Sequence, residues 1–159
     1  MGWLTVQSFA DKGAKVVIGD FNEEGGKQVE QELKNQGKDV QFIKVDAGDE
    51  DSVASMVKET AEHYGQVDII VNNAGIGILG ETHEMSYEDY QKVIKVNQDG
   101  VFFGMKHAIR EMLKTGGGVI VNTASILGSV GEAGALPYNA SKGAVNLMIN
   151  NEVSSTAIC

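Results

Sequence analysis

Short hydrophobic runs alternate along the chain with longer segments in which hydrophobic residues recur every three or four positions. A typical short run is Val16, Val17 and Ile18, which has the length and residue types of a β-strand. An apolar run without alternation is typical of a strand covered on both faces, as in a parallel sheet between helices. The pattern predicts strands at residues 15–20, 40–45, 68–72 and 119–123.

The longer segments have the spacing of amphipathic helices. After Asp49, for example, Val53 and Val57 share one face and Lys58 lies on the other. Ser86 followed three residues later by an acidic residue resembles a capping box. The pattern predicts helices at residues 3–10, 22–37, 50–64 and 86–114, and a last helix that begins at Pro137.

Strands that alternate with helices predict an α/β fold with a parallel sheet and right-handed crossovers. We find no repeat, linker or low-complexity segment, so residues 1–159 are expected to form a single domain. Ligands of such sheets bind beyond the carboxyl ends of the strands. The candidates for a functional site are therefore the polar or small residues in those places: Asp20, Asp46, residues 72–75 and Ser125.

Composition narrows the range of partners. The formal net charge is −9, from 22 acidic and 13 basic residues, which argues against nucleic acid because that partner needs clustered Lys and Arg. The one cysteine, Cys159, excludes an internal disulfide framework and favours neither a metal site nor a nucleophile, so we expect no metal and a cytoplasmic location. No apolar run has the length of a membrane span, so no membrane partner is expected.

Tyr138 and Lys142 are four residues apart on the last predicted helix. Their side chains therefore project from the same face, about one helical turn apart, and a turn is about 5.4 Å long. A nearby ammonium stabilises a phenolate and lowers the pKa of the phenol toward a range useful for proton transfer. Taken alone, a half-buried Tyr and a solvated Lys at this spacing are common.

Ser125 and Asn97 each have a structural and a functional interpretation. Ser125 follows a predicted strand, where its hydroxyl can meet a substrate oxygen or simply cap a turn. Asn97 lies on an apolar helical stripe, where it is either a core amide satisfied by backbone groups or part of a polar network. Acyl hydrolysis by Ser125 ranks last, because no histidine is evidently tied to it.

Two further groups fit a flat, charged ligand. Asn73, Ala74 and Gly75 follow a predicted strand, and such small residues let a ligand approach the backbone, although a plain turn would also use them. Asp20 ends the first predicted strand, where a carboxylate can bind both ribose hydroxyls and repel a 2′-phosphate. By itself, an Asp in this position is more often a turn former.

Together these segments resemble the short-chain dehydrogenases/reductases. The matching segments, in order, are Asp20 after its strand, Val45-Asp46, Asn72-Asn73-Ala74-Gly75, Val96-Asn97, Asn122-Thr123-Ala124-Ser125 and Tyr138-Asn139-Ala140-Ser141-Lys142-Gly143-Ala144. Ser125 precedes Tyr138 by 13 residues, which is typical of the family. The ordered set is specific and covers most of the chain as far as Met148.

The resemblance implies a catalytic tetrad. Tyr138 would be the general acid/base, Lys142 would lower its pKa and hold the nicotinamide ribose, Ser125 would polarise the substrate oxygen, and Asn97 would support a proton relay. The reaction implied is hydride transfer between NAD(H) and a secondary alcohol or ketone. The cofactor residues implied are Gly2, Asp20, Asp46, Ala47, Asn73, Ala74, Gly75, Tyr138 and Lys142.

By the same resemblance, the fold is an incomplete, doubly wound parallel sheet of Rossmann type, a partial NAD(P)-binding domain. The first strand with its Gly-rich loop and the C-terminal strands are expected to be missing. Gly2 looks like the last glycine of that loop, and residues 149–159 form a divergent tail. The missing strand would lie between the strands that end at Asp20 and Asn72.

The resemblance leaves two functions open. The first is an NAD-dependent oxidoreductase that acts on a small alcohol or ketone and whose complete protein is a homo-oligomer, a dimer or a tetramer. The second is an inactive fragment that serves only as an oligomerisation or interaction module through the helices that contain Asn97 and Tyr138.

Overall fold

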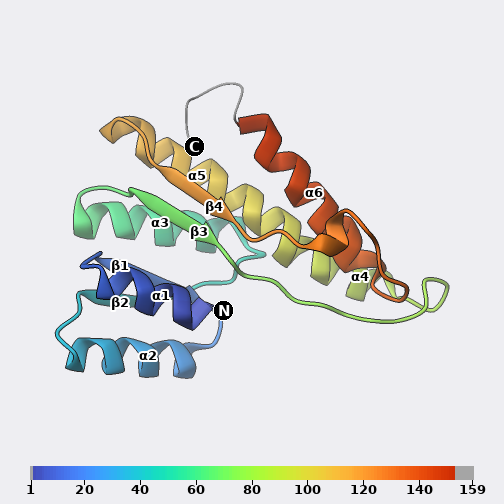
Figure 1. Cartoon of the computed structure of the whole chain (residues 1–159), viewed down its shortest axis with the longest axis horizontal. Helices are drawn as coiled ribbons and strands as arrows, with labels where there is room; N and C mark the ends of the chain where they lie inside the picture. The colour runs from blue at the N-terminus through green and yellow to red at the C-terminus, as the bar shows by residue number, and fades with distance from the viewer. Residues whose placement is uncertain (1, 153–159) are drawn as a thin grey trace.

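The computed structural model describes residues 2–152, in which helices and strands alternate (Figure 1). The elements are α1 (Gly2–Asp11), β1 (Val16–Asp20), α2 (Glu23–Asn35), β2 (Val40–Lys44), α3 (Glu50–Tyr64), β3 (Ile69–Asn72), α4 (Tyr87–Ile94), a π-helical turn (Lys95–Asp99), α5 (Gly100–Thr115), β4 (Val119–Asn122), a 3₁₀ turn (Ile126–Gly128) and α6 (Leu136–Glu152). Of the segment 149–159, residues 149–152 continue α6, and residues 153–159, with Cys159, lie outside the described part.

The four strands form two parallel pairs, β1 with β2 and β3 with β4. Their registers align the carboxyl ends, with Asp20 opposite Lys44 and Asn72 opposite Asn122. Among the described residues, no strand pairs with both β1 and β3. This agrees with the incomplete parallel sheet that the sequence predicts.

The pair β1–β2 has helices on both faces. On one face α1 and α2 bury a core of Ala10, Leu33 and Val40. On the other face α3 packs closely, since a Cβ on Gly19 of β1 would lie 2.5 Å from Met56 Sδ. The expected cover on both faces is therefore found for this pair.

The pair β3–β4 has helices on one face only within the described residues. There α3 and α5 bury a cluster of Val57, Val67, Ala108 and Met112. On the other face Val119 and Val121 are 38% and 45% exposed. Cover on both faces, which an unbroken apolar run indicates, is therefore wrong for β4, because no described helix covers its second face.

Polar side chains cap the starts of three helices, and a glycine ends one of them. Asn22, Asp49 and Ser86 each accept a hydrogen bond from the first turn of the following helix. Gly65 ends α3 with a φ of 87°, a left-handed conformation that glycine adopts without strain. These local signals explain why the element boundaries could be predicted closely.

The long helix predicted over residues 86–114 is not continuous. A π-helical turn, Lys95–Asp99, separates α4 from α5 and contains the buried Asn97. Such turns add a residue to the helical repeat and therefore redirect side chains. Gly100 follows directly, and a Cβ there would lie 2.7 Å from the Ala47 carbonyl oxygen, so only glycine lets α5 approach the end of β2 this closely.

Candidate active site

The first turns of α6 present Tyr138 and Lys142 to the carboxyl end of β4. Pro137 is buried in the first turn of this helix, where its missing N–H has no cost. Lys142 Nζ donates a hydrogen bond of 2.6 Å to the carbonyl oxygen of Thr123 and lies 5.8 Å from the centre of the Tyr138 ring. The predicted pair is thus brought together on one helical face.

Lys142 is buried rather than solvated. Its side chain is 3% exposed, and removal from water lowers the pKa of the ammonium below its ordinary value of 10.5. Burial of an ammonium is costly unless the group is well hydrogen-bonded. The interpretation of Lys142 as an ordinary solvated lysine is therefore excluded.

Asn97 forms the hub of a hydrogen-bond network. Its side chain is 0% exposed; its Oδ1 accepts from the backbone N of Ile76 at 2.8 Å, and its Nδ2 donates to the Ile76 carbonyl at 2.9 Å. Nδ2 also donates to Ser141 Oγ at 3.2 Å. Both interpretations of Asn97 hold in part, because the amide is satisfied by backbone groups and also reaches α6.

Gly75 lies against both the Asn97 amide and the Lys142 ammonium. A Cβ on Gly75 would be 3.5 Å from Asn97 Oδ1 and 3.7 Å from Lys142 Nζ, and a Cβ on Gly77 would be 3.9 Å from Tyr138 Cδ2. The loop after β3 therefore passes directly over the Asn97 amide, the ammonium and the phenol ring. Small residues at these two positions keep that approach open.

Ser125 lies beside the same helix. Its Oγ accepts from the backbone N of Leu127 at 3.2 Å, so its capping role is real. A Cβ on Gly128, at the end of this 3₁₀ turn, would lie 2.5 Å from the Lys142 carbonyl carbon, and Thr123 binds the Lys142 ammonium. Thr123 before Ser125 and Gly128 after it therefore both contact Lys142.

The predicted nucleotide-binding carboxylates lie at the carboxyl ends of β1 and β2. Asp20 and Asp46 are both exposed, and the backbone N of Val45 donates to the Asp20 carbonyl at 3.0 Å. Each side chain also accepts a local backbone hydrogen bond, from Asn22 for Asp20 and from Gly48 for Asp46. Their turn-forming role is thus present, and each carboxylate keeps a face toward solvent.

Gly2 and Asn73 meet across the two sheets. A Cβ on Gly2, in the first turn of α1, would lie 3.3 Å from Asn73 Nδ2, which is tight for any other residue. Ala74 and Gly75, which follow Asn73, are exposed. The first turn of α1 offers backbone N–H groups, which suit a diphosphate. The exposed backbone of residues 74–75 lets a ligand come close, and the Asp20 carboxylate can accept hydrogen bonds from ribose hydroxyls. Together these features suit a dinucleotide.

Two side-chain amides join the carboxyl ends of β3 and β4. Asn72 Nδ2 donates to Asn122 Oδ1 at 2.7 Å, and Asn122 Nδ2 lies 3.5 Å from Met105 Sδ on α5. The side chain of Asn72 also fills the place of a Cβ at Gly104. The ends of β3 and β4 are thereby fixed to each other and to α5.

Sequence reasoning did not single out two contributors to this site. One is the carbonyl of Thr123, which no side-chain pattern can reveal. The other is Ser141, whose hydroxyl is completely buried and bonds both Asn97 and the carbonyl of Tyr138. Its signal was available, since a small hydroxyl residue one turn after Tyr138 shares that residue's helical face.

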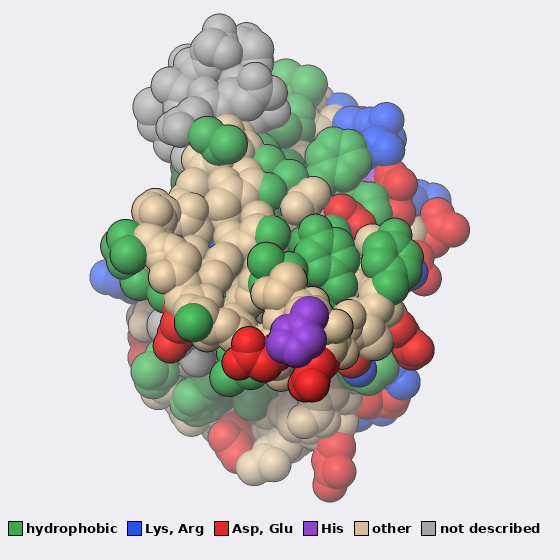
Figure 2. Space-filling model, turned by 90° about the vertical axis from the view of Figure 1, so that its right-hand side faces the viewer, with side chains coloured by type: hydrophobic (Ala, Val, Ile, Leu, Met, Phe, Trp, Pro, Cys, Tyr) green, Lys and Arg blue, Asp and Glu red, His purple; other side chains and the backbone are tan. Residues whose placement is uncertain are grey.

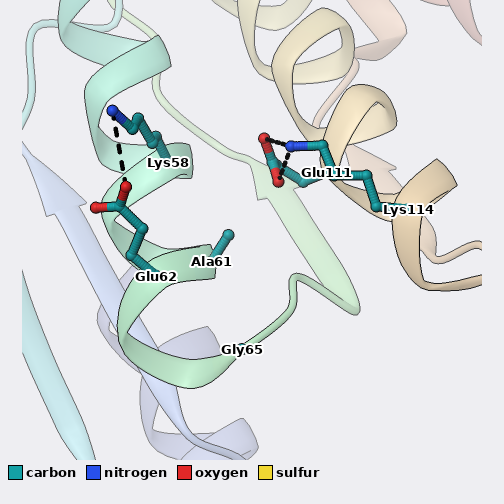
Figure 3. Close-up of a pocket in the computed structure, with 6 residues that line it drawn as sticks. All are labelled: Lys58, Ala61, Glu62, Gly65, Glu111 and Lys114. Carbon is teal, nitrogen blue, oxygen red and sulfur yellow. Dashed lines mark hydrogen bonds and ion pairs between the residues drawn. The ribbon is translucent and has the colours of Figure 1, made fainter.

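The pocket of the described structure that Figure 3 shows lies elsewhere. Lys58, Ala61, Glu62, Gly65, Glu111 and Lys114 line it, at the carboxyl ends of α3 and α5 (Figure 3). In this region Val119 N bonds the Asp68 carbonyl, which marks the amino edge of β3–β4. The hollow is therefore on the opposite edge from Tyr138 and Lys142 and is not part of the candidate site.

The end of the molecule that contains the 76–86 loop and α4 shows hydrophobic side chains beside acidic ones (Figure 2). Leu79, Ile126 and Val130 are among the exposed large hydrophobic residues, and they belong to the loops that follow β3 and β4. The backbone of these two loops is joined by a bond of 2.9 Å from Gly80 N to the Gly134 carbonyl. The surface that adjoins the site is thus more apolar than the overall charge suggests.

The sequence profile of the short chain dehydrogenase family matches residues 1–157. The chain belongs to this family. The predicted resemblance is confirmed, and the similar proteins include ones named as oxidoreductases and dehydrogenases.

The chain is also similar to individual proteins of known sequence or structure. An uncharacterized oxidoreductase of Thermotoga maritima is 43% identical over 143 residues, which are 90% of this chain and 56% of the relative. The NADP-dependent (R)-specific alcohol dehydrogenase of Lentilactobacillus kefiri is 36% identical over 160 residues, 99% of this chain and 63% of that enzyme. The crystal structure of gox2181 has a TM-score of 0.88 and 32% identity, and the match covers 92% of this chain and 58% of that one.

This likeness confirms the predicted α/β class and the incomplete Rossmann-type sheet. The chain spans less than two thirds of the length of each of the three proteins. No helix in residues 2–152 is long and apolar enough to cross a membrane. In the same residues, no three His, Cys, Asp or Glu side chains are grouped so that they could hold a metal ion.

Replacement of Lys142 by Met tests whether burial of this ammonium serves the fold. Met removes a charge that is costly to bury, so the free energy of unfolding of Lys142→Met at neutral pH is expected to equal or exceed the native value. Because burial lowers the pKa of Lys142 in the folded chain, native stability should rise relative to the variant as the pH approaches 10.5. Urea unfolding of the native chain and the variant, at neutral pH and near pH 10.5, measures both free energies.

The matched control is Val145→Ala on the same helix, at a fully buried side chain. It should lose about 2 kcal/mol, because two methyl groups leave the core. A loss of this size for Lys142→Met would contradict the view that the fold does not require the ammonium.

Proposed function

We propose that this protein is a cytoplasmic oxidoreductase that interconverts a secondary alcohol and a ketone, with NAD as the hydride carrier. The observation that best supports this proposal is the buried Lys142 ammonium beside the Tyr138 ring, with Asn97 and the Gly75 backbone within contact distance. These groups can move a proton to or from a substrate oxygen. Bound NAD would supply the hydride acceptor that the side chains lack.

Tyr138 is the proton donor and acceptor in this proposal. Its side chain is half-buried at the start of α6, so its hydroxyl can meet both a substrate and water. The Lys142 ammonium, held at 5.8 Å from the ring centre, stabilises negative charge on the phenol oxygen when the proton has left. Lys142 would also bind the hydroxyls of the nicotinamide ribose.

Ser125 and Asn97 support that transfer. Ser125 would donate a hydrogen bond to the substrate oxygen, since its Oγ accepts locally from Leu127 N and its own hydrogen is available for another acceptor. The fixed amide of Asn97 would hold the π-helical turn in place. Water could then connect this turn with the Lys142 ammonium. In this arrangement Ser125 orients the substrate and Asn97 sustains the proton relay.

The cofactor would extend from α6 across the carboxyl ends of β3, β1 and β2. Gly2, Asn73, Ala74 and Gly75 would line its diphosphate and nicotinamide half, where the backbone is open. At the far end the exposed Asp20 would bind the adenosine ribose, with Asp46 and Ala47 flanking the adenine.

An inactive interaction module is less well supported. A helix that served only as an interface would gain nothing from a lysine buried to 3% exposure, because the same volume of apolar side chain packs without the cost of desolvation. The burial of Lys142 is explained by chemistry at the site.

Cofactor preference follows from Asp20. Its carboxylate would repel a 2′-phosphate, so the purified chain is expected to bind NADH at least about tenfold more tightly than NADPH. Fluorescence titration with the two dinucleotides measures this. Asp20→Ala should reduce the difference mainly by improving NADPH binding, whereas Asp39→Ala, at the opposite edge, should not; a folded chain that binds neither dinucleotide contradicts the proposal.

Turnover should depend on the phenol of Tyr138. Tyr138→Phe keeps the ring and removes the proton donor, so NAD-dependent oxidation of a panel of secondary alcohols should fall at least about a hundredfold. The control is Tyr87→Phe, at an exposed tyrosine on α4, which should retain native rates. Equal rates for Tyr138→Phe and the native chain would exclude Tyr138 as the acid/base.

We also propose that the protein forms a homodimer or homotetramer through α5 and α6. Phe102 and Leu113 are exposed and lie on one face of α5, because 11 residues are close to three helical turns, and Leu147 is exposed on α6. Light scattering of the purified chain should give the mass of a dimer or tetramer, and Leu113→Glu should reduce it. A native chain that is monomeric at all concentrations would contradict this assembly.

A further inference from the structure

Ser141 carries the one buried hydroxyl group in the described part of α6 that bonds both this helix and the Asn97 amide. Its side chain is 0% exposed, and its Oγ donates to the Tyr138 carbonyl at 2.8 Å. The same oxygen accepts from Asn97 Nδ2 at 3.2 Å. We propose that Ser141 is a positioning residue, which holds the Asn97 amide in register with the turn of α6 that bears Tyr138 and Lys142.

The directions of the hydrogen bonds support this assignment. A hydroxyl has one hydrogen, and Ser141 uses it on the Tyr138 carbonyl, so only its lone pairs face Asn97. The Asn97 amide must therefore present its nitrogen to Ser141 and its oxygen to the backbone N–H of Ile76. One amide orientation satisfies all of these groups, and the flipped orientation would leave the donor of Ile76 facing a second donor.

The position of Ser141 links three segments that are distant in the sequence. Asn97 belongs to the π-helical turn, Ile76 to the loop after β3, and Ser141 to α6. That loop also places Gly75 against Lys142 Nζ and Gly77 against the Tyr138 ring. Loss of the hydroxyl would leave one N–H of Asn97 without its partner in a dry environment and would remove the hydrogen bond that joins α6 to the Asn97 amide.

The physical consequence concerns proton transfer more than cofactor binding. Ser141 touches neither the exposed Asp20 nor the Gly2–Asn73 approach, so removal of its hydroxyl should leave most contacts of the dinucleotide in place and weaken its binding only slightly. The distance from Tyr138 to a substrate oxygen, by contrast, depends on the placement of α6 against the loop. Small displacements of a reacting group cost far more in rate than in affinity.

Ser129 offers a matched control. Its Oγ also accepts from an asparagine amide of α6, Asn146 Nδ2, at 3.2 Å, but this pair is exposed. Ser129→Ala therefore removes the same chemical contact from the same helix without touching the Asn97 network. A general loosening of α6 would affect both serine variants alike.

The experiment, which rests on the proposed function, measures kcat and KM for NAD in the native chain, Ser141→Ala and Ser129→Ala. Ser141→Ala should lower kcat about tenfold, which corresponds to one lost hydrogen bond, and leave KM for NAD within about twofold. Ser129→Ala should match the native chain in both constants. If Ser141→Ala does not fold, Ser141→Cys, which keeps a weak donor and acceptor, should fold and give an intermediate kcat.

The outcomes separate this inference from the function on which it rests. A native kcat in Ser141→Ala, or an equal fall in Ser129→Ala, overturns the positioning role of Ser141 and leaves the oxidoreductase proposal standing. A native chain that folds but shows no turnover with NAD overturns both. An increase in KM for NAD without a change in kcat also overturns it, because it would place Ser141 in cofactor binding.

Discussion

The burial of one ammonium group organises the candidate site. Lys142 is almost fully removed from water, and the strongest compensation in the described structure is its 2.6 Å hydrogen bond to the Thr123 carbonyl. That bond ties α6 to the end of β4. Because Thr123 N is itself bonded to the Asn72 carbonyl, the constraint extends to β3 and the loop that bears Gly75.

The parallel pairing of β3 and β4 makes this constraint possible. Both strands end at the same edge, and the amides of Asn72 and Asn122 join them there. The π-helical turn directs Asn97 toward the same place, where it meets the loop after β3 and Ser141. A fold with exposed faces and few strands thus still fixes its polar groups at the carboxyl edge, where α/β proteins bind their ligands.

Much of this fold could be predicted from hydrophobic spacing and helix caps, because both are local. Ser86, for example, caps the start of a helix where the sequence predicts it. The interruption of the helix at Lys95–Asp99 was not predicted, and the partner of Asn97 in that turn, the backbone of Ile76, is distant in the sequence. For the same reason the Thr123 carbonyl escaped notice, although the spacing of Tyr138 and Lys142 identified the pair.

The most direct test of the account is the pKa of Lys142 in the folded chain. NMR titration of lysine side chains labelled at the ε-carbon, with the Lys142 signal assigned by its loss in Lys142→Met, gives this value. The account predicts a pKa below the ordinary 10.5, with the other lysine signals as internal references. A pKa at or above 10.5 would contradict the claim that removal from water dominates the environment of this ammonium.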